Sequence, residues 1–493
     1  MKLISLRKPT DTIDHRFMLL VIICTAVMLF LGCSSSGSSP DEPRVLARVE
    51  VPAYLEDLNL PVYADLEDAG GNYYALVIAT KTQLNKAGAT YRVIDEYLPG
   101  TDYLIALDLE DVEGARQEAA RLMHVLYDDG EHIIVRYKSE LSELLPDIGF
   151  DLKMMSQDPI NFNRVDLPVI ARSNSPSLAF ASGKNPKVEA MLAAVTEEDI
   201  KSSTELLSGE RPVEVDGAAY AIVNRHTKSG IPVQKATQYV YDRLKDMGLT
   251  PSFSEWTFEN EGESLKNRNV VGEIKGQSTP EEIVILIAHL DSISDATDGI
   301  EPGADDNASG CVALLTAANI MKAYKFKRTV RFVFTTGEEQ SLFGGTAYAK
   351  KAKTEGQKIV AVLNLDMIGY SKVTDPPVKP KQQIKIRHWQ NQTGYAMDLR
   401  IAQAYIDVVK TYGLDQVFEA VIVDDGEVTS DQSPFWDTKI YPAAWVIEYA
   451  EKGYINPKMH SRNDRINIMN LPYYAAVVKA ALGTAANMAE TMD

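Results

Sequence analysis

Cysteine is scarce in this chain, which has three in 493 residues. Cys24 and Cys33 lie near the N-terminus, and Cys311 is the only cysteine in the remaining sequence. We therefore expect no disulfide, because a chain with one thiol outside its N-terminal segment cannot build a disulfide framework. The fold must be held together by a hydrophobic core, for which the length and the 45% hydrophobic content are sufficient.

Positive charge is also in short supply. The chain has 50 lysines and arginines against 69 aspartates and glutamates, a formal net charge of −19. Nucleic-acid binding is therefore excluded as a main role, because the phosphate backbone selects basic surfaces. An acidic surface of this kind mostly favours solubility.

The N-terminal segment 1–32 is predicted to be a bacterial lipoprotein signal peptide. Basic residues precede an apolar stretch from Phe17 to Leu31, and the stretch ends at Gly32 and Cys33. We expect cleavage before Cys33 and lipid on its thiol, although an uncleaved anchor is an alternative. Residues 33–44 are predicted to be a flexible tether. The protein is then exported and anchored by lipid to the cell envelope, with the outer membrane favoured because Ser34 is not an aspartate.

Residues 45–156 contain a faint internal repeat. Each copy has the pattern of a strand, a short helix ended by glycine, and a second strand, with the two glycines at Gly88 and Gly149. The pattern predicts an N-terminal α+β accessory domain, followed by a linker over 157–186. This domain carries no obvious cluster of metal ligands or nucleophiles. A lid or substrate guide and a simple spacer are both open interpretations.

Three apolar runs farther along the chain have the composition of strands covered on both faces. They are Ile283–Ala288, Thr329–Thr335 and Ile359–Leu365. Each run is followed by acids or a histidine, which are His289, the pair Glu338-Glu339, and Asp366. Ligands of open α/β sheets bind outside the carboxyl ends of the strands, so we expect these side chains to converge.

Two further candidates lie outside those strands. Asp306 falls in the segment GADDNASG at 303–310, just before an amphipathic helical pattern, and His460 lies near the C-terminus. Taken singly, each of these motifs is usually structural. Taken together they indicate a two-metal hydrolase, because buried carboxylates are costly unless they are paired or coordinated.

Five motifs carry a resemblance to a known family. They are AHLDS at 288–292, GADDNASG at 303–310, TTGEEQSLFGG at 335–345, NLDMIG at 364–369 and NPKMHSRND at 456–464. The chain over about 186–490 resembles the M28-type zinc aminopeptidases, which include bacterial secreted di-zinc enzymes. The resemblance implies a catalytic domain over 187–493 of the zinc-exopeptidase-like α/β class, with a mixed, mostly parallel sheet flanked by helices.

The resemblance also implies a role for each site residue. One metal would be held by His289, Asp306 and Asp366, and the other by Asp306, Glu339 and His460, so that Asp306 bridges them. Glu338 would be the general base. Asp291 would orient His289, and Asp464 is a candidate to orient His460. Two Zn²⁺ suit these nitrogen and oxygen ligands, and Mn²⁺ or Co²⁺ could take their place.

The expected function is that of an exported aminopeptidase, which hydrolyses the first residue from peptides with a free N-terminus through a metal-activated water. Two departures from the family pattern bear on the pocket. Met459 stands where relatives often carry a tyrosine, which leaves Tyr454 or the metals to stabilise the oxyanion. Gln432 replaces a histidine and predicts an altered pocket wall. The stretch 371–398 is predicted to be a loop that lines the specificity pocket.

Three alternative functions are compatible with the sequence. A glutaminyl cyclase shares the fold and uses one zinc ion, so the metal stoichiometry distinguishes it. A carboxypeptidase or amidohydrolase could use the same metals. A non-catalytic receptor or adhesin is the alternative from another class, and any turnover would exclude it.

Overall fold

A computed structural model describes residues 42–52, 55–108, 114–160, 183–260, 263–294, 299–374, 376–388, 392–451 and 453–493. The predicted signal peptide and Cys33 lie outside these residues. Arg44–Asp493 forms one compact unit. Among the described residues, no helix is both long enough and apolar enough to cross a membrane.

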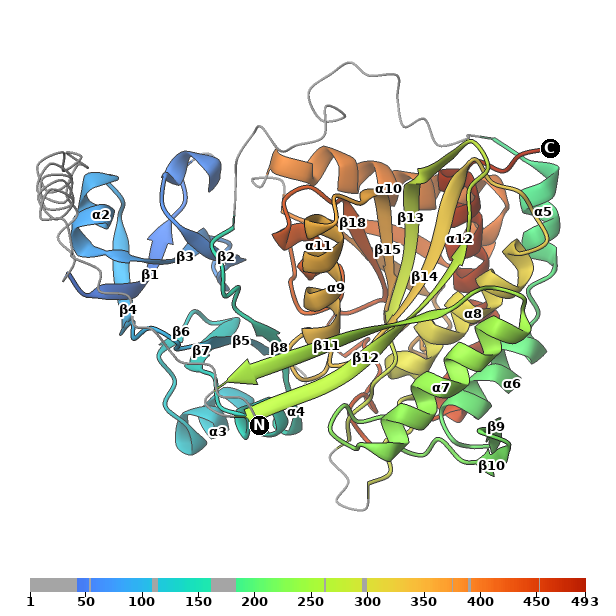
Figure 1. The fold of residues 1–493 in the computed structure, drawn as a ribbon, viewed down its shortest axis with the longest axis horizontal. Coiled ribbons are helices and arrows are strands. Elements are labelled where there is room, and N and C mark those ends of the chain that lie inside the picture. Colours follow the sequence, from blue (N-terminus) through green and yellow to red (C-terminus); the bar gives the residue numbers. More distant parts are fainter. Residues whose placement is uncertain are drawn as a thin grey trace, which may run out of the picture. The chain divides into compact units, whose positions relative to one another are not determined.

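The accessory domain consists of two copies of one β-α-β-β-α-β arrangement (Figure 1). In the first copy the elements are β1 (Arg44–Glu50), η1 (Leu55–Leu58), β2 (Val62–Glu67), β3 (Tyr73–Thr80), α2 (Lys81–Lys86) and β4 (Tyr91–Glu96). In the second they are β5 (Tyr103–Asp108), α3 (Ala115–Leu122), β6 (Tyr127–Asp128), β7 (His132–Arg136), α4 (Leu141–Asp147) and β8 (Phe150–Met154). The sheet orders β2-β3-β1-β4 and β6-β7-β5-β8 correspond strand for strand, and all pairs are antiparallel.

The catalytic domain contains an eight-stranded sheet in the order β11-β12-β14-β13-β15-β18-β16-β17. The four central strands are parallel, and antiparallel pairs join them to β12 and β16. The strands are β11 (Ser252–Asn260), β12 (Glu263–Ile274), β13 (Thr279–His289), β14 (Arg328–Thr335), β15 (Lys358–Leu365), β16 (Lys381–Lys385), β17 (Glu419–Val423) and β18 (Ala443–Glu448). The sheet is therefore mixed and mostly parallel at its centre, as predicted.

Helices cover both faces of this sheet because its central strands are apolar throughout. Along β13, Val284, Leu286 and Ala288 belong to the core shared with α7 (Ile231–Asp246), α8 (Gly310–Met321), α10 (Gln392–Thr411) and α12 (Leu471–Ala489). The alternate residues Ile283, Ile285 and Ile287 pack with α9 (Phe343–Thr354) and α11 (Ser433–Asp437). Other described elements of the domain are α5 (Pro186–Ala193), α6 (Glu197–Leu207), β9 (Val213–Val215), β10 (Ala218–Tyr220), η3 (Ala304–Ser309), η4 (Leu414–Gln416) and η5 (Ile466–Ile468).

The prediction that 371–398 is a loop is wrong for part of the stretch. It contains β16, which lies between β18 and β17, and the beginning of α10. The strand is largely buried in spite of its polar sequence, and each buried polar side chain has at least one partner on another element. Gln382 accepts a hydrogen bond from Tyr405, Gln383 donates to Glu451, and Lys385 pairs with Glu427.

The second copy of the accessory repeat packs against the catalytic domain. Trp256 and Phe343 complete its hydrophobic core. Lys153 on β8 donates to the hydroxyl of Ser433 at 2.7 Å and pairs with Asp437 at 3.0 Å, both on α11. These contacts fix β8 relative to the large sheet.

A second polar contact joins α4 to the loop before α7. The Oε2 atom of Glu143 lies 2.8 Å from His226 Nε2, and its Oε1 atom lies 2.5 Å from Lys228 Nζ. Burial opposes ionisation of both partners, but the His226 and Lys228 contacts lower the pKa of Glu143 to about 2. The Glu143 contact in turn raises the pKa of His226. The attraction between Glu143 and His226 is therefore greatest at pH values at which both groups are charged.

Candidate active site

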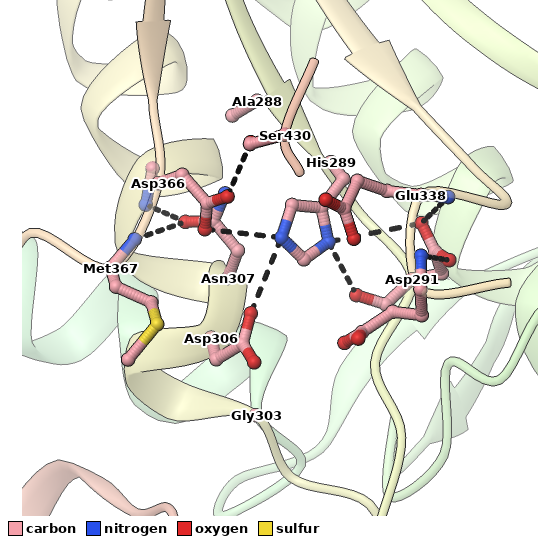
Figure 2. A network of polar contacts seen from close by, with 12 residues as sticks. Ala288, His289, Asp291, Gly303, Asp306, Asn307, Glu338, Asp366, Met367 and Ser430 are labelled. Atoms are coloured by element: carbon pink, nitrogen blue, oxygen red, sulfur yellow. Dashed lines mark hydrogen bonds and ion pairs between the residues drawn. The ribbon is translucent and has the colours of Figure 1, made fainter. Parts of the chain in front are cut away.

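The carboxyl ends of the central strands deliver the predicted residues to one place (Figure 2). His289 is the last residue of β13, Asp366 follows β15 directly, and Glu338 and Glu339 follow β14 after a short turn. His460 comes from the loop between β18 and η5. The side chain of His289 is 1% exposed and that of His460 is 13% exposed, so both imidazoles are largely removed from solvent.

These residues form two groups that share Asp306. His289 Nε2 lies 3.2 Å from Asp306 Oδ1 and 3.1 Å from Asp366 Oδ1. His460 Nε2 lies 3.1 Å from Asp306 Oδ2 and 3.2 Å from Glu339 Oε2. Within each group the potential ligand atoms all lie within 4.8 Å of one another, so each group could hold a metal ion. Asp306 turns one carboxylate oxygen toward each group.

The backbone around Asp306 depends on two glycines and one asparagine. A Cβ atom on Gly303, whose φ is 43°, would lie 2.1 Å from the Asp306 carbonyl oxygen, and a Cβ on Gly310 would lie 2.1 Å from the Leu365 carbonyl oxygen. Asn307 donates its side-chain amide to the Leu365 carbonyl at 2.9 Å and accepts from the Gly310 amide at 2.8 Å. The Asp306 loop is thereby tied to the end of β15, where Asp366 begins.

Arg225 is a buried residue that the motifs do not reveal. It is 0% exposed, and its guanidinium donates to the carbonyl oxygens of Leu290 and Pro302 at 2.6 Å, Gly303 at 2.8 Å and Leu207 at 3.1 Å. Two of these carbonyls adjoin the segments that carry Asp291 and Asp306. One planar side chain therefore holds both site loops together.

The role predicted for Asp291 is only partly visible in the structure. His289 Nδ1 lies 3.2 Å from the backbone carbonyl oxygen of Asp291 and 3.8 Å from its carboxylate. That carboxylate accepts from the Thr227 hydroxyl at 2.9 Å and faces the backbone amides of Glu338 and Glu339 at 3.4 and 3.3 Å. Asp291 thus contacts His289 chiefly through its main chain, and its side chain positions the glutamate pair.

The role predicted for Asp464 needs correction. Its carboxylate accepts from the backbone amide of Asp306 at 2.9 Å, from that of Asp305 at 3.1 Å and from the Asn456 side chain at 3.1 Å. We assign it to the Asp306 loop and not to His460. Four residues separate Asp464 from His460 in the sequence, but the intervening turn directs the carboxylate elsewhere.

The charges of the site call for a cation. Burial raises the pKa of Glu339 to about 8, with the Asp306 carboxylate adding to the effect, and burial also raises the pKa of Glu338 well above its usual range. Burial acts to lower the pKa of His289, but the carboxylates of Asp366 and Glu338 outweigh it and raise that pKa. Glu339 Oε1 is buried without a hydrogen-bond partner among the described residues. These residues fit a divalent metal, which would neutralise the carboxylates and use the free oxygen.

A cavity of about 280 Å³ lies over these residues. One side of it is apolar and is formed by Met367, Trp445, Ile447, Ile455 and Met459. Tyr454 is 43% exposed and is not among the residues that line the cavity, so it does not replace the missing tyrosine. Gln432 is fully buried and bonds Asn364 and the Glu427 carbonyl; the altered pocket wall expected from it is therefore wrong.

Comparison with known proteins agrees with this site. A sequence model described as peptidase family M28 matches residues 269–485. A probable leucine aminopeptidase of Arthroderma otae is 31% identical over 271 residues, which cover 53% of this chain and 67% of that protein. The chain belongs to peptidase family M28. Leucine aminopeptidase 1 of Trichophyton equinum, at 28% identity, is matched over 45% of this chain and 59% of its own length.

Solved structures support the predicted fold class of this M28 protein. The LapA aminopeptidase of Legionella pneumophila has a TM-score of 0.56 at 19% identity and covers 80% of this chain and 100% of its own. LapB of the same organism has a TM-score of 0.55 at 16% identity, with 79% and 100% coverage. The predicted family and fold class are confirmed, and the shared fold extends beyond the catalytic domain alone.

Three acidic residues of the cavity wall escaped the sequence analysis. Asp108, Glu131 and Asp151 belong to the accessory domain, yet they line the same cavity as the predicted metal ligands. Their positions depend on how β8 packs against α11, which no local motif encodes. They also lie outside the region matched by the M28 family.

Proposed function

We propose that this protein is a di-zinc aminopeptidase that removes a bulky apolar residue from the free N-terminus of peptides. The predicted enzyme class, a metallo-aminopeptidase, is confirmed by the family and by its leucine aminopeptidase relatives. The zinc number, the mechanism and the substrate are our proposal. The observation that carries it is Asp306, which offers one oxygen to the His289 group and the other to the His460 group.

In this proposal each residue has one task. His289, Asp306 and Asp366 would hold one zinc ion, and Asp306, Glu339 and His460 the other. Bound zinc supplies positive charge that acidifies water and polarises the peptide carbonyl. Glu338 takes a proton from the attacking water and returns it to the leaving amine. Its place in the cavity wall beside Glu339 suits that transfer.

The cavity supports the choice of substrate. Its apolar side, formed by the five residues from Met367 to Met459 named above, can accept an aliphatic or aromatic side chain. Met367 and Trp445 are almost fully buried and belong to one apolar cluster with Ile447. We therefore expect leucine-like residues to be released fastest, as the names of the fungal relatives also suggest.

The experiment uses the full-length chain with zinc and three reporter peptides, which begin with leucine, N-acetyl-leucine and glutamine. We expect hydrolysis of the free leucyl peptide, little of the acetylated one, and two zinc ions per chain by elemental analysis. Cleavage of the blocked peptide would contradict an aminopeptidase. Cyclisation of the glutaminyl peptide by a chain with one zinc would instead indicate a cyclase.

The general base is tested by Glu338→Gln. We expect both zinc ions to remain and kcat to fall roughly 10²- to 10⁴-fold, because only proton transfer is removed. Glu301→Gln is the matched control, since Glu301 is also a buried glutamate but does not line the cavity. Loss of zinc from the Glu338 variant would mean that the two adjacent glutamates have been assigned in the wrong order.

The cellular location is a separate proposal that rests on the sequence. We propose that the protein is exported and held at the outer membrane by lipid on Cys33, with the tether 33–44 between the lipid and the folded domains. The apolar stretch before Cys33 and the serine-rich segment after it support this location.

A further inference from the structure

The cavity over the metal centre has a wall that comes from the accessory domain. Leu107 and Asp108 are at the end of β5, Glu131 precedes β7, and Asp151 lies on β8. Apart from Leu107, every residue of this wall is acidic. The cavity is therefore lined by the four acidic side chains of the candidate metal site and by three more from the accessory domain.

Asp151 is the member of this wall that charge interactions link to the candidate site. It interacts electrostatically with His460, Asp306, Asp366 and His289, which are proposed metal ligands. Its neighbours Phe150 and Leu152 point into the accessory core, so the alternation of β8 directs Asp151 to the other face. Lys153, two residues on and therefore on the same face, is held by Ser433 and Asp437.

The other carboxylates of the cavity are already engaged or lie farther away. Asp425 and Glu427 pair with Lys385, and Glu451 accepts from Gln383. Asp108 faces Arg116. The main electrostatic neighbours of Glu131 are His132, Asp129, Asp425 and Glu67. The Asp151 carboxylate has no hydrogen bond or ion pair to any residue in the described part of the chain.

We propose that Asp151 binds the α-ammonium group of the substrate, so that the accessory domain completes the active site. This inference rests on the proposed aminopeptidase function. An ammonium group would pair with the Asp151 carboxylate, which lines the cavity and has no partner among the described residues. The other carboxylates have tasks in the proposed function: Asp306, Glu339 and Asp366 would hold the metals, and Glu338 would act on the water.

The test compares two inhibitors that differ only in the amine. L-leucine hydroxamate carries the α-ammonium group, and isocaproic hydroxamate lacks it. Both are titrated against the zinc-loaded full-length chain and against Asp151→Asn, Asp151→Glu and the control Glu131→Gln, which alters another acid of the same wall. Zinc content and the thermal midpoint are measured for each variant.

We expect the wild type and Glu131→Gln to prefer the amine-bearing inhibitor. Asp151→Asn should weaken leucine hydroxamate roughly 30-fold or more and leave isocaproic hydroxamate unchanged, because only the ammonium loses its partner. Asp151→Glu, which keeps the charge, should recover part of the preference. The preference is the ratio of the two inhibition constants measured on the same preparation. A loss of folded protein affects both constants equally and therefore does not change the ratio.

Two results would overturn the inference, and they have different meanings. If Asp151→Asn weakens both inhibitors equally, or neither, Asp151 does not bind the ammonium group while the aminopeptidase proposal stands. If the wild type itself shows no preference for the amine, the site does not recognise a free N-terminus, and the proposed function fails together with the inference.

Discussion

Arg225→Lys tests whether one guanidinium holds the catalytic loops. The change keeps a positive charge but replaces a planar group that reaches four carbonyl oxygens by a single ammonium nitrogen. The guanidinium uses all three of its nitrogens on these carbonyls, so a single ammonium nitrogen at one position cannot reach them all. We expect at least two buried carbonyls to lose their donor. At about 1–3 kcal/mol for each of two carbonyls, the free energy of unfolding should fall by about 2–6 kcal/mol.

The assay is urea unfolding of the metal-free chain, which separates this effect from loss of zinc. Arg211→Lys is the control, because Arg211 is half-exposed and its ion pair with Glu205 should contribute less than about 1 kcal/mol. Zinc affinity should also fall by about 10-fold or more in the Arg225 variant, since the loops of Asp291 and Asp306 lose their common support. Equal stability of the two variants would refute the reasoning.

Two further predictions concern the domain contact and the anchor. His226→Gln should destabilise the protein most between pH 4.5 and 6.5. The raised pKa of His226 stabilises the fold below pH 6.5, and this stabilisation is lost as the pH rises further. The lowered pKa of Glu143 stabilises the fold above pH 4.5, and this stabilisation is lost as the pH falls toward about 2. Because Glu143 is partly exposed, the free energies of unfolding of the wild type and the variant should differ by about 0.5–1 kcal/mol in urea titrations. A difference that stays constant up to about pH 9 would contradict this prediction. Cys33→Ser should abolish incorporation of labelled lipid and processing at this position, and cleavage before residue 33 in that variant would exclude a lipoprotein.

The sequence is sufficient to predict the central strands and the convergence of the candidate site residues, because both depend on short-range patterns. An apolar run such as Ile283–Ala288 identifies a buried strand, and the residue that follows it, His289, must lie at the carboxyl edge of a parallel sheet. Asp306 can be placed in a loop because an amphipathic helical pattern begins just after it. The structure brings these side chains within 3.2 Å of their neighbours, although the side chains come from segments far apart in the sequence.

Other residues could not be predicted because their partners are remote or belong to the main chain. Arg225 lies in an unremarkable segment, and its four acceptors are carbonyl oxygens, which every residue possesses. Asp464 was assigned to the nearest histidine in sequence, whereas its partners are backbone amides near residue 305. The sequence of β16 predicts a loop because the hydroxyl that donates to Gln382 and the carboxylates that pair with Lys385 lie on other elements.

The contacts of α4 and β8 favour a substrate guide over a spacer for the accessory domain. Glu143 on α4 is held by His226 and Lys228, and Lys153 on β8 is held by α11. The catalytic domain therefore contacts this helix and strand on both sides of Asp151 in the sequence. A spacer would need neither contact, nor an acidic wall in the same cavity as the proposed metal ligands. Weakening the Glu143 contact should therefore act on the binding of the amine more than on the chemical step, raising KM with little change in kcat.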